Sequence, residues 1–257
     1  MAQNPILGPG FIRAVRLNRE KISDWKAFPF CIPVMKKLKR LELHPAVTFL
    51  VGENGVGKST LLEAIAIKLG FNPEGGSKNM QFKTRESHSE LYRHVTLERA
   101  PHRPMDGFFL RAESVYTMAT EIEALDKQPF CGPLLPSYGG KSLHEQSHGE
   151  SFFSVLQHRL GGQGIYVFDE PEAALSPSRQ MSVLTLMHDL VRDHSQFIIS
   201  THSPILMAYP HSYIYLLTQK GIKRVNYEDT EHFRVTRDFL NRHEKMVHYL
   251  LSELPLD

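Results

Sequence analysis

The sequence predicts an α/β fold with a mostly parallel central sheet. Apolar runs at residues 46–51, 165–169 and 196–200 are short and continuous, which is typical of strands buried on both faces of a sheet. Segments with apolar residues at helical spacing follow the first two runs, at residues 59–69 and 177–193. Strands that alternate with helices form a parallel sheet covered on both faces, and such a sheet binds ligands at the carboxyl ends of its strands.

The other predicted elements add an antiparallel β portion and a helical lobe. Residues 129–150 are rich in Gly, Pro and Ser, which predicts a long loop of a kind that is often functional. We expect a single domain over residues 1–257, with an inserted helical lobe at approximately 71–160. The remaining elements are strands at 11–18 and 107–112, helices at 113–125, 151–160 and 230–253, and a hairpin formed by 212–218 and 221–228.

Composition and charge are those of an ordinary globular protein. The chain is 41% hydrophobic and 23% charged, and its net charge of +2 is too small by itself to indicate nucleic-acid or membrane binding. The two cysteines, Cys31 and Cys131, have no metal-binding or redox spacing and are expected to be reduced thiols. Neither a signal peptide nor an apolar run of about 20 residues is found. We therefore expect a soluble, cytoplasmic protein with no direct membrane insertion.

Residues 52–59 carry the most specific motif. Their sequence, Gly-Glu-Asn-Gly-Val-Gly-Lys-Ser, matches the phosphate-binding pattern G-x-x-x-x-G-K-[ST] between a predicted strand and a predicted helix. Glycines allow backbone N–H groups to converge on phosphate oxygens, and the helix directs its positive end at them. Lys58 is expected to reach the β- and γ-phosphates, Ser59 to bind Mg²⁺, and Thr60 to contact the α-phosphate region. The motif predicts a P-loop NTPase fold whose nucleotide-binding residues are Gly52, Glu53, Asn54, Gly55, Val56, Gly57, Lys58, Ser59 and Thr60.

Acidic residues follow the predicted strand at 165–169. Asp169 lies at its end, where a carboxylate faces the phosphate loop and can bind Mg²⁺. Glu170 would then polarise the attacking water. The alternative is an acidic loop that caps the next helix, and Glu172 fits either a cap or a contact with a partner.

These motifs resemble, in order along nearly the whole chain, those of the ABC ATPase superfamily. The resemblance is to its soluble, non-transporter members, the RecF, SMC and OLD-like group and small AAA-family ATPases. Residues 52–59 resemble the Walker A motif, and VFDEP at 167–171 resembles Walker B, with Glu170 as the catalytic glutamate. FIISTHSP at 197–204 resembles the switch strand, with His202 as the histidine that senses the γ-phosphate.

The signature motif of the superfamily has a counterpart in QSHGE at residues 146–150, which keeps Ser147, Gly149 and Glu150. The resemblance implies that two copies of the chain meet head to tail. In that arrangement these three residues bind the ATP held by the other copy. The catalytic residues that the resemblance implies are Lys58, Glu170 and His202.

One residue departs from the superfamily pattern. A glutamine commonly follows a strand between Walker A and the signature, but GFFLRAES offers Glu113 at the comparable place. A carboxylate could partly serve in its contact with Mg²⁺, and the missing glutamine argues against a transporter subunit. The resemblance thus implies Ser59, Asp169 and Glu113 as the metal ligands.

Three other patterns have alternative interpretations. HEQSH at residues 144–148 matches the zinc pattern H-E-x-x-H, which functions only on a helix, yet it overlaps the signature in a weakly helical region. The basic cluster at residues 35–40 could bind DNA phosphates or form a solvated loop. Phe28 could stack on adenine or pack in the core.

The sequence leaves the biological role open. We expect an ATPase that uses ATP and Mg²⁺, dimerises around the nucleotide, and acts as a switch or motor for an unidentified protein partner. It could be a DNA-linked ATPase in repair or phage defence. It could also be the ATP-binding subunit of a transporter, or a regulatory ATPase bound to a separate effector such as a nuclease or toxin.

Overall fold

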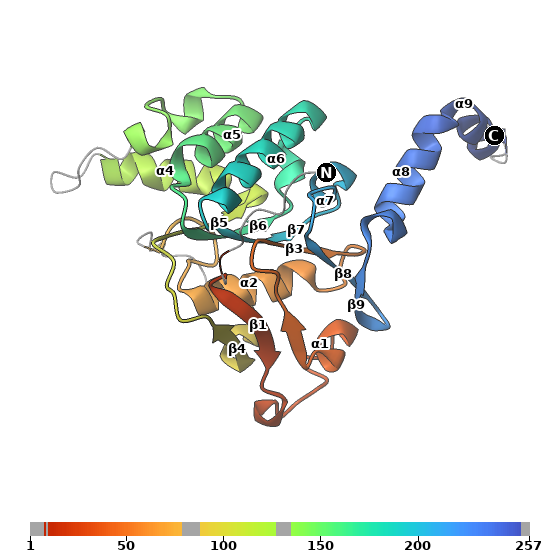
Figure 1. Cartoon of the computed structure of the whole chain (residues 1–257), viewed down its shortest axis with the longest axis horizontal. Helices are drawn as coiled ribbons and strands as arrows, with labels where there is room; N and C mark the ends of the chain where they lie inside the picture. Colours follow the sequence, from red (N-terminus) through yellow and green to blue (C-terminus); the bar gives the residue numbers. More distant parts are fainter. Residues whose placement is uncertain (1–7, 9, 79–87, 127–134, 253–257) are drawn as a thin grey trace.

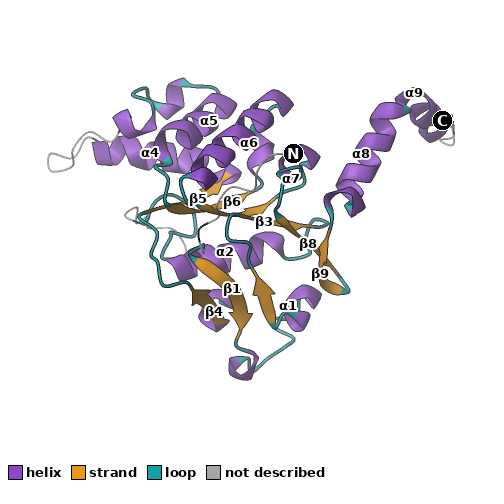
Figure 2. Ribbon diagram, in the orientation of Figure 1, coloured by secondary structure: helices purple, strands orange, loops and turns teal. Residues whose placement is uncertain are grey.

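The computed structural model describes residues 8, 10–78, 88–126 and 135–252, and these form an α/β fold with two sheets (Figures 1 and 2). The larger sheet has six strands in the order β5-β6-β7-β3-β8-β9, and β9 alone runs antiparallel to its neighbour. The predicted mostly parallel sheet is therefore confirmed. Its strands are β5 (Asp106–Arg111), β6 (Gly164–Asp169), β7 (Gln196–Ser200), β3 (Val47–Val51), β8 (Tyr213–Thr218) and β9 (Gly221–Val225).

The smaller sheet is antiparallel and has the order β2-β1-β4. The predicted strand near the N-terminus is β1 (Ile12–Leu17), whose neighbours are β2 (Arg40–Glu42) and β4 (Val95–Arg99). The polar segment at residues 81–100, which the sequence predicts to hold a short helix or strands, contains the short helix α3 (Leu91–His94) and β4, whereas the three-residue strand β2 was not predicted. The short helix α1 (Pro33–Lys37) precedes β2.

The larger sheet is covered by helices on both faces (Figure 1). On one face, α2 (Lys58–Leu69) packs with the smaller sheet in an apolar core that includes Leu61 and Ile65. The opposite face carries the second core, which includes Phe168 and Phe197. The helices of that face are α4 (Val115–Asp126), α5 (His148–Arg159) and α6 (Pro177–Arg192), with α7 (Pro204–Met207) beside them.

Residues 71–160, the predicted inserted lobe, are not wholly separate from the sheets. β4 belongs to the smaller sheet and β5 to the larger one, and the longer helices of the segment, α4 and α5, begin only after β5. The predicted loop at 129–150 contains two single-turn helices, Leu135–Tyr138 and Leu143–Glu145. The division into one domain with an inserted lobe stays a prediction. Cys131 lies outside the described residues, whereas Cys31 is a half-buried free thiol.

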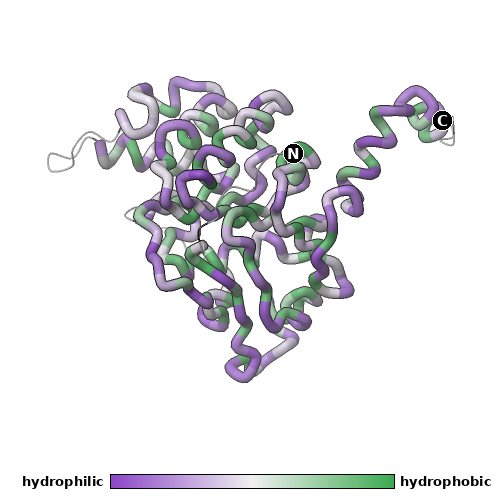
Figure 3. Tube along the Cα trace, viewed as in Figure 1, coloured by the Kyte–Doolittle hydropathy of each residue, from purple (hydrophilic) through white to green (hydrophobic). Residues whose placement is uncertain are grey.

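The last two helices, α8 (Glu231–Asn241) and α9 (His243–Ser252), lead away from the body of the molecule (Figure 1). We call them the C-terminal arm. Neither helix buries a residue, and Figure 3 shows apolar and polar positions interleaved along both. In the part of the chain that is described, no helix is long and apolar enough to cross a membrane. The large exposed apolar residues of the arm are Val235, Phe239, Leu240, Val247, Tyr249, Leu250 and Leu251.

Candidate nucleotide-binding site

The loop between β3 and α2 has a backbone that requires glycine at two points. Gly52 has φ 145°, and a Cβ atom there would lie 2.3 Å from the carbonyl oxygen of Leu217. Gly57 has φ 105° and directly precedes the first residue of α2, so the loop enters the helix in a left-handed conformation that L side chains rarely adopt. The loop therefore wraps tightly around the N-terminal end of α2, where backbone N–H groups favour an anion.

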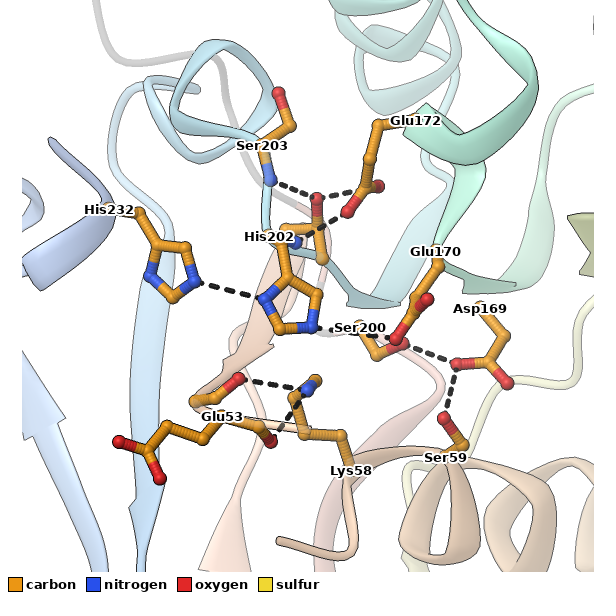
Figure 4. A network of polar contacts seen from close by, with 12 residues as sticks. Glu53, Lys58, Ser59, Asp169, Glu170, Glu172, Ser200, His202, Ser203 and His232 are labelled. Atoms are coloured by element: carbon orange, nitrogen blue, oxygen red, sulfur yellow. Dashed lines mark hydrogen bonds and ion pairs between the residues drawn. The ribbon is translucent and has the colours of Figure 1, made fainter. Parts of the chain in front are cut away.

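The ammonium group of Lys58 lies inside this loop. Its Nζ donates hydrogen bonds to the carbonyl oxygens of Gly52 at 2.8 Å and Glu53 at 3.0 Å (Figure 4). Burial lowers the pKa of Lys58, and the nearby carboxylates of Glu170 and Asp169 oppose this shift. The loop's own carbonyls thus accept the hydrogen bonds that phosphate oxygens could take over.

The carboxylate of Asp169, at the carboxyl end of β6, accepts hydrogen bonds from two hydroxyl groups. Its Oδ1 accepts hydrogen bonds from Ser59 Oγ at 3.1 Å and Ser200 Oγ at 2.5 Å (Figure 4). The three residues meet because β3, β6 and β7 run parallel and end at the same edge of the sheet. Sequence analysis predicted Ser59 and Asp169 but missed Ser200, whose only signal was its place at the end of an apolar strand.

An arginine that sequence analysis also missed faces the other oxygen of Asp169. Arg111, the last residue of β5, has its Nε 3.6 Å from Asp169 Oδ2, and its Nη1 is 3.1 Å from Glu63 Oε2. By contrast, Glu113 is exposed, and none of the described hydrogen bonds or ion pairs joins it to Asp169 or Ser59. Its role as a metal ligand stays a prediction.

Glu170 and His202 face each other across the site. Glu170 has a left-handed backbone with φ 48°, and its backbone N–H donates to the carbonyl oxygen of Ser200 at 3.0 Å. Its side chain is 40% exposed, and Oε1 lies 3.5 Å from His202 Nε2 (Figure 4). The carboxylate is thus open to water and close to the imidazole.

His202 is held by two residues that sequence analysis did not place with it. Its backbone N–H donates to Glu172 Oε1 at 2.5 Å, and its Nδ1 lies 3.0 Å from Nε2 of His232, at the start of α8 (Figure 4). Thr201 Oγ1 donates to the other oxygen of Glu172 at 2.8 Å. Burial raises the pKa of Glu172 despite these hydrogen bonds.

A pocket of about 400 Å³ opens beside the phosphate loop. Its lining includes the loop residues Asn54 and Gly55, the side chain of Glu170, and Phe28. Phe28 is 65% exposed, so the alternative that it packs in the core is wrong. An exposed aromatic face next to a phosphate loop is suited to stacking on a base.

The signature residues lie at the start of α5, on the sheet face opposite α2. Ser147 caps the helix, and its backbone N–H and Oγ both donate to Glu150 Oε2, at 3.1 and 2.7 Å. Arg179 of α6 donates to the carbonyl oxygen of Gly149 at 2.8 Å. The described polar side-chain contacts of these residues run to one another and to Arg179, and none runs to the phosphate loop.

The zinc interpretation of residues 144–148 is wrong. A single-turn helix ends at Glu145 and α5 begins at His148, so residues 144–148 do not form the continuous helix that the zinc pattern requires. Among the described residues, no group of three or more His, Cys, Asp or Glu side chains could hold a metal ion.

The basic cluster at residues 35–40 is divided between buried and paired side chains. Met35 and Leu38 are buried, Lys37 donates to the carbonyl oxygen of Lys220 at 2.8 Å, and Arg40 contacts Glu98 and Glu42. Two of the four cations are thus engaged within the protein, which leaves a smaller surface for DNA than the sequence suggests.

Two family models match parts of the chain that together contain most of this site. One, described as an AAA domain, matches residues 21–102, which include the phosphate loop. The other, described as an AAA ATPase domain, matches residues 152–207, which include Asp169, Glu170 and His202.

Several known proteins are similar to this chain in sequence or in fold. An uncharacterized ABC transporter ATP-binding protein of Haemophilus influenzae is 27% identical over 186 residues, which cover 66% of this chain and 69% of that protein. The hemin import ATP-binding protein HmuV of Bordetella avium is 31% identical over 161 residues, 56% of this chain and 61% of that protein. A chain of a metal-chelate type ABC transporter, solved in an inward-facing conformation, shares the fold with a TM-score of 0.50 at 16% identity, and 88% of each chain is covered. The chain spans between 52% and 69% of the length of the first curated relatives.

Proposed function

We propose that this chain is an ATPase of the ABC-type superfamily and that it hydrolyses Mg²⁺-bound ATP as a nucleotide-dependent switch for a protein partner. The observation that carries the proposal is the convergence of Ser59, Asp169 and Ser200 at the ends of three parallel strands, beside the buried Lys58. A phosphate loop, an acidic strand end and a nearby carboxylate are the parts that phosphoryl transfer to water requires.

The residues at this point fit a magnesium ion. Ser59 Oγ and Asp169 Oδ1 are 3.1 Å apart, and hydroxyl and carboxylate oxygens are the ligands that Mg²⁺ prefers. Ser59 and Asp169 would hold the ion, which would neutralise charge on the phosphate oxygens when bound. Arg111 lies against the same carboxylate and keeps it paired with a cation.

The remaining roles follow from the geometry of the side chains. Lys58 would release its two carbonyl acceptors and donate to phosphate oxygens, since its ammonium already lies within the loop. Glu170 would accept a proton from the attacking water, because its exposed carboxylate borders the pocket. His202 would donate a hydrogen bond to the γ-phosphate from Nε2, the ring nitrogen that faces the site.

We also propose a head-to-tail homodimer. Support comes from the position of Ser147, Gly149 and Glu150 at the N-terminal end of α5, away from the phosphate loop of their own chain. A helix N-terminus with a serine cap is suited to binding an anion. A second copy could bring this end over ATP held at residues 52–59, so the γ-phosphate would join the two copies and its loss would separate them.

Turnover by the wild type and by Glu170→Gln tests the hydrolysis. The amide keeps the size of the carboxyl but cannot take a proton, so we expect ATP binding to persist and turnover to fall about a hundredfold or more. Glu244→Gln, on the exposed arm, is the matched control. Equal inactivity of the wild type and Glu170→Gln, with ATP bound to both, would falsify the mechanism.

Light scattering of Glu170→Gln with ATP and Mg²⁺ tests the dimer. The variant should trap ATP between two copies and double the mass of the particle. A monomer under these conditions would exclude the head-to-tail arrangement.

A transporter subunit is the second candidate function. It is favoured by the curated relatives, several of which are ATP-binding proteins of ABC transporters, and it is opposed by Glu113 at the place of the usual glutamine. Two further alternatives are a cytoplasmic DNA-linked ATPase in repair or phage defence and a regulatory ATPase bound to a nuclease or toxin. Purification of the tagged chain from native cells separates these roles, since a membrane protein, DNA or a separate effector would be recovered with it.

A further inference from the structure

His202 and His232 form a chain of two imidazoles, and the outer nitrogen atom of each ring makes no hydrogen bond. Nδ1 of His202 and Nε2 of His232 are 3.0 Å apart, a hydrogen-bonding distance. His202 Nε2 and His232 Nδ1 are buried without a hydrogen-bond partner. Buried polar nitrogens are rarely left unpaired unless a ligand or a functional group takes them up.

When both rings are neutral, only one proton lies between His202 Nδ1 and His232 Nε2, so one of these atoms donates the hydrogen bond and the other accepts it. If His202 Nδ1 carried this proton, His202 Nε2 would present a lone pair to the site. If His232 Nε2 carries it, His202 accepts at Nδ1 and its own proton resides on Nε2. The two arrangements therefore give the γ-phosphate sensor opposite hydrogen-bonding character.

The carboxylate of Glu170 favours the arrangement in which His202 carries its proton on Nε2. Its carboxylate Oε1 lies 3.5 Å from His202 Nε2, and an ionised carboxylate only accepts hydrogen bonds. A lone pair on Nε2 would repel this oxygen, and it would repel a phosphate oxygen equally. His232 is suited to the neutral donor role because burial lowers its pKa, and the neighbouring His202 lowers it further.

The position of His232 is fixed by the start of α8. Thr230 is fully buried, and its hydroxyl donates to the carbonyl oxygen of Tyr227 at 2.7 Å while accepting from the backbone N–H of Phe233 at 3.3 Å. Tyr227 in turn donates from its hydroxyl to the carbonyl oxygen of Pro204, two residues after His202, at 2.8 Å. The first turn of α8 is thereby tied to the segment that carries His202.

We propose that His232 is a positioning residue, whose Nε2–H holds His202 in the tautomer that donates from Nε2. The inference rests on the proposed function, because it assigns the partner of the residue that would sense the γ-phosphate. His232 does not touch the phosphate itself. It sets which nitrogen of His202 carries the proton and fixes the orientation of the ring.

A donor and an acceptor of equal size at position 232 test this role. His232→Gln keeps an N–H near the place of Nε2, so it should retain most of the turnover. His232→Glu can only accept when ionised, so it should reverse the tautomer of His202 and lower kcat about tenfold or more, with little change in KM. His243→Glu, on the exposed arm, controls for the added charge, and thermal unfolding confirms that each variant is folded.

Imidazole ¹⁵N spectra of the nucleotide-free protein read the tautomer directly. We expect the proton on His202 Nε2 in the wild type and in His232→Gln, and on Nδ1 in His232→Glu. If His232→Glu does not fold, His232→Leu replaces it as the variant without a donor and should lose turnover relative to His232→Gln. A wild-type turnover in His232→Glu, or a His202 proton on Nδ1 in the wild type, would overturn the inference.

The failure of the proposed function has a different signature. In that case the wild type itself would show no ATP turnover, while the ¹⁵N spectra would still show which nitrogen of His202 carries the proton.

Discussion

Glu172 is a carboxyl group that the fold buries beside Thr201 and His202. It accepts hydrogen bonds from the backbone N–H of His202 and from Thr201, and burial nevertheless raises its pKa above the ordinary 4.5. A raised pKa means that the folded state binds this proton more tightly than the unfolded chain does. The charged carboxylate therefore costs stability, and that cost grows as pH rises from 4.5 towards the raised pKa and is constant above it.

Glu172→Gln should reveal this cost. The amide carries no charge, so the melting temperature of the wild type should fall relative to that of the variant as pH rises through this window. The measurement is thermal unfolding of both proteins from pH 4 upwards, in steps. A difference in melting temperature that does not vary with pH would show that Glu172 keeps an ordinary pKa in the folded state.

Single residues also mark what could be predicted from the sequence. Lys58, Ser59 and Asp169 belong to local motifs, and the structure brings them together as the motifs indicate. Ser200 and Arg111 could not be found in this way. Their place depends on which strands are neighbours, and a single sequence contains no record of that pairing.

At the scale of elements, the long periodic segments were predicted well and the short ones were not. The strand β7 and the helix α6 have apolar patterns that can be found in the local sequence alone. β4 has alternating burial over five residues, but it lies in a polar segment and pairs with β1 about 80 residues away. The local pattern left a short helix and strands as alternatives in residues 81–100, and the pairing with β1 is what makes residues 95–99 a strand.

The first turn of α8 gives a prediction at this scale. Thr230→Val removes the hydroxyl that caps the helix and should lower the free energy of unfolding by about 1 kcal/mol. Thr230→Ser keeps the hydroxyl and should cost less. Urea denaturation measures all three proteins, with Thr236→Val as the control in the interior of the same helix. An equal loss in Thr230→Val and Thr236→Val would mean that the cap contributes nothing specific.

At the scale of the whole molecule, the two halves of the proposed composite site lie in different parts of one chain. The phosphate loop belongs to the α2 face of the sheet and the signature residues belong to the α5 face. The order of motifs along the sequence predicts both halves. It does not predict how far apart the fold places them, and this separation is what makes a second copy necessary for the proposed mechanism.

Mixing two inactive variants tests that separation. Lys58→Ala disables the phosphate-loop half of the composite site, and Ser147→Arg obstructs the half that carries the signature residues. A head-to-tail heterodimer of the two has one site with both defects and one site with neither, so a mixture should regain up to about a quarter of wild-type turnover. Each variant alone should stay inactive. A mixture without recovery would argue that each site is complete within one chain.

The C-terminal arm has a consequence for how the protein behaves in concentrated solution. Seven large apolar side chains of the arm are exposed, among them Leu240 at 67% and Leu250 at 64%. Salts that are excluded from protein surfaces increase the cost of hydrating such groups. The chain should therefore precipitate at low ammonium sulfate concentration, and Leu240→Lys with Leu250→Lys should raise that concentration without changing turnover per chain. Turbidity against salt concentration measures both proteins, and identical curves would show that the arm does not govern the solubility of the molecule.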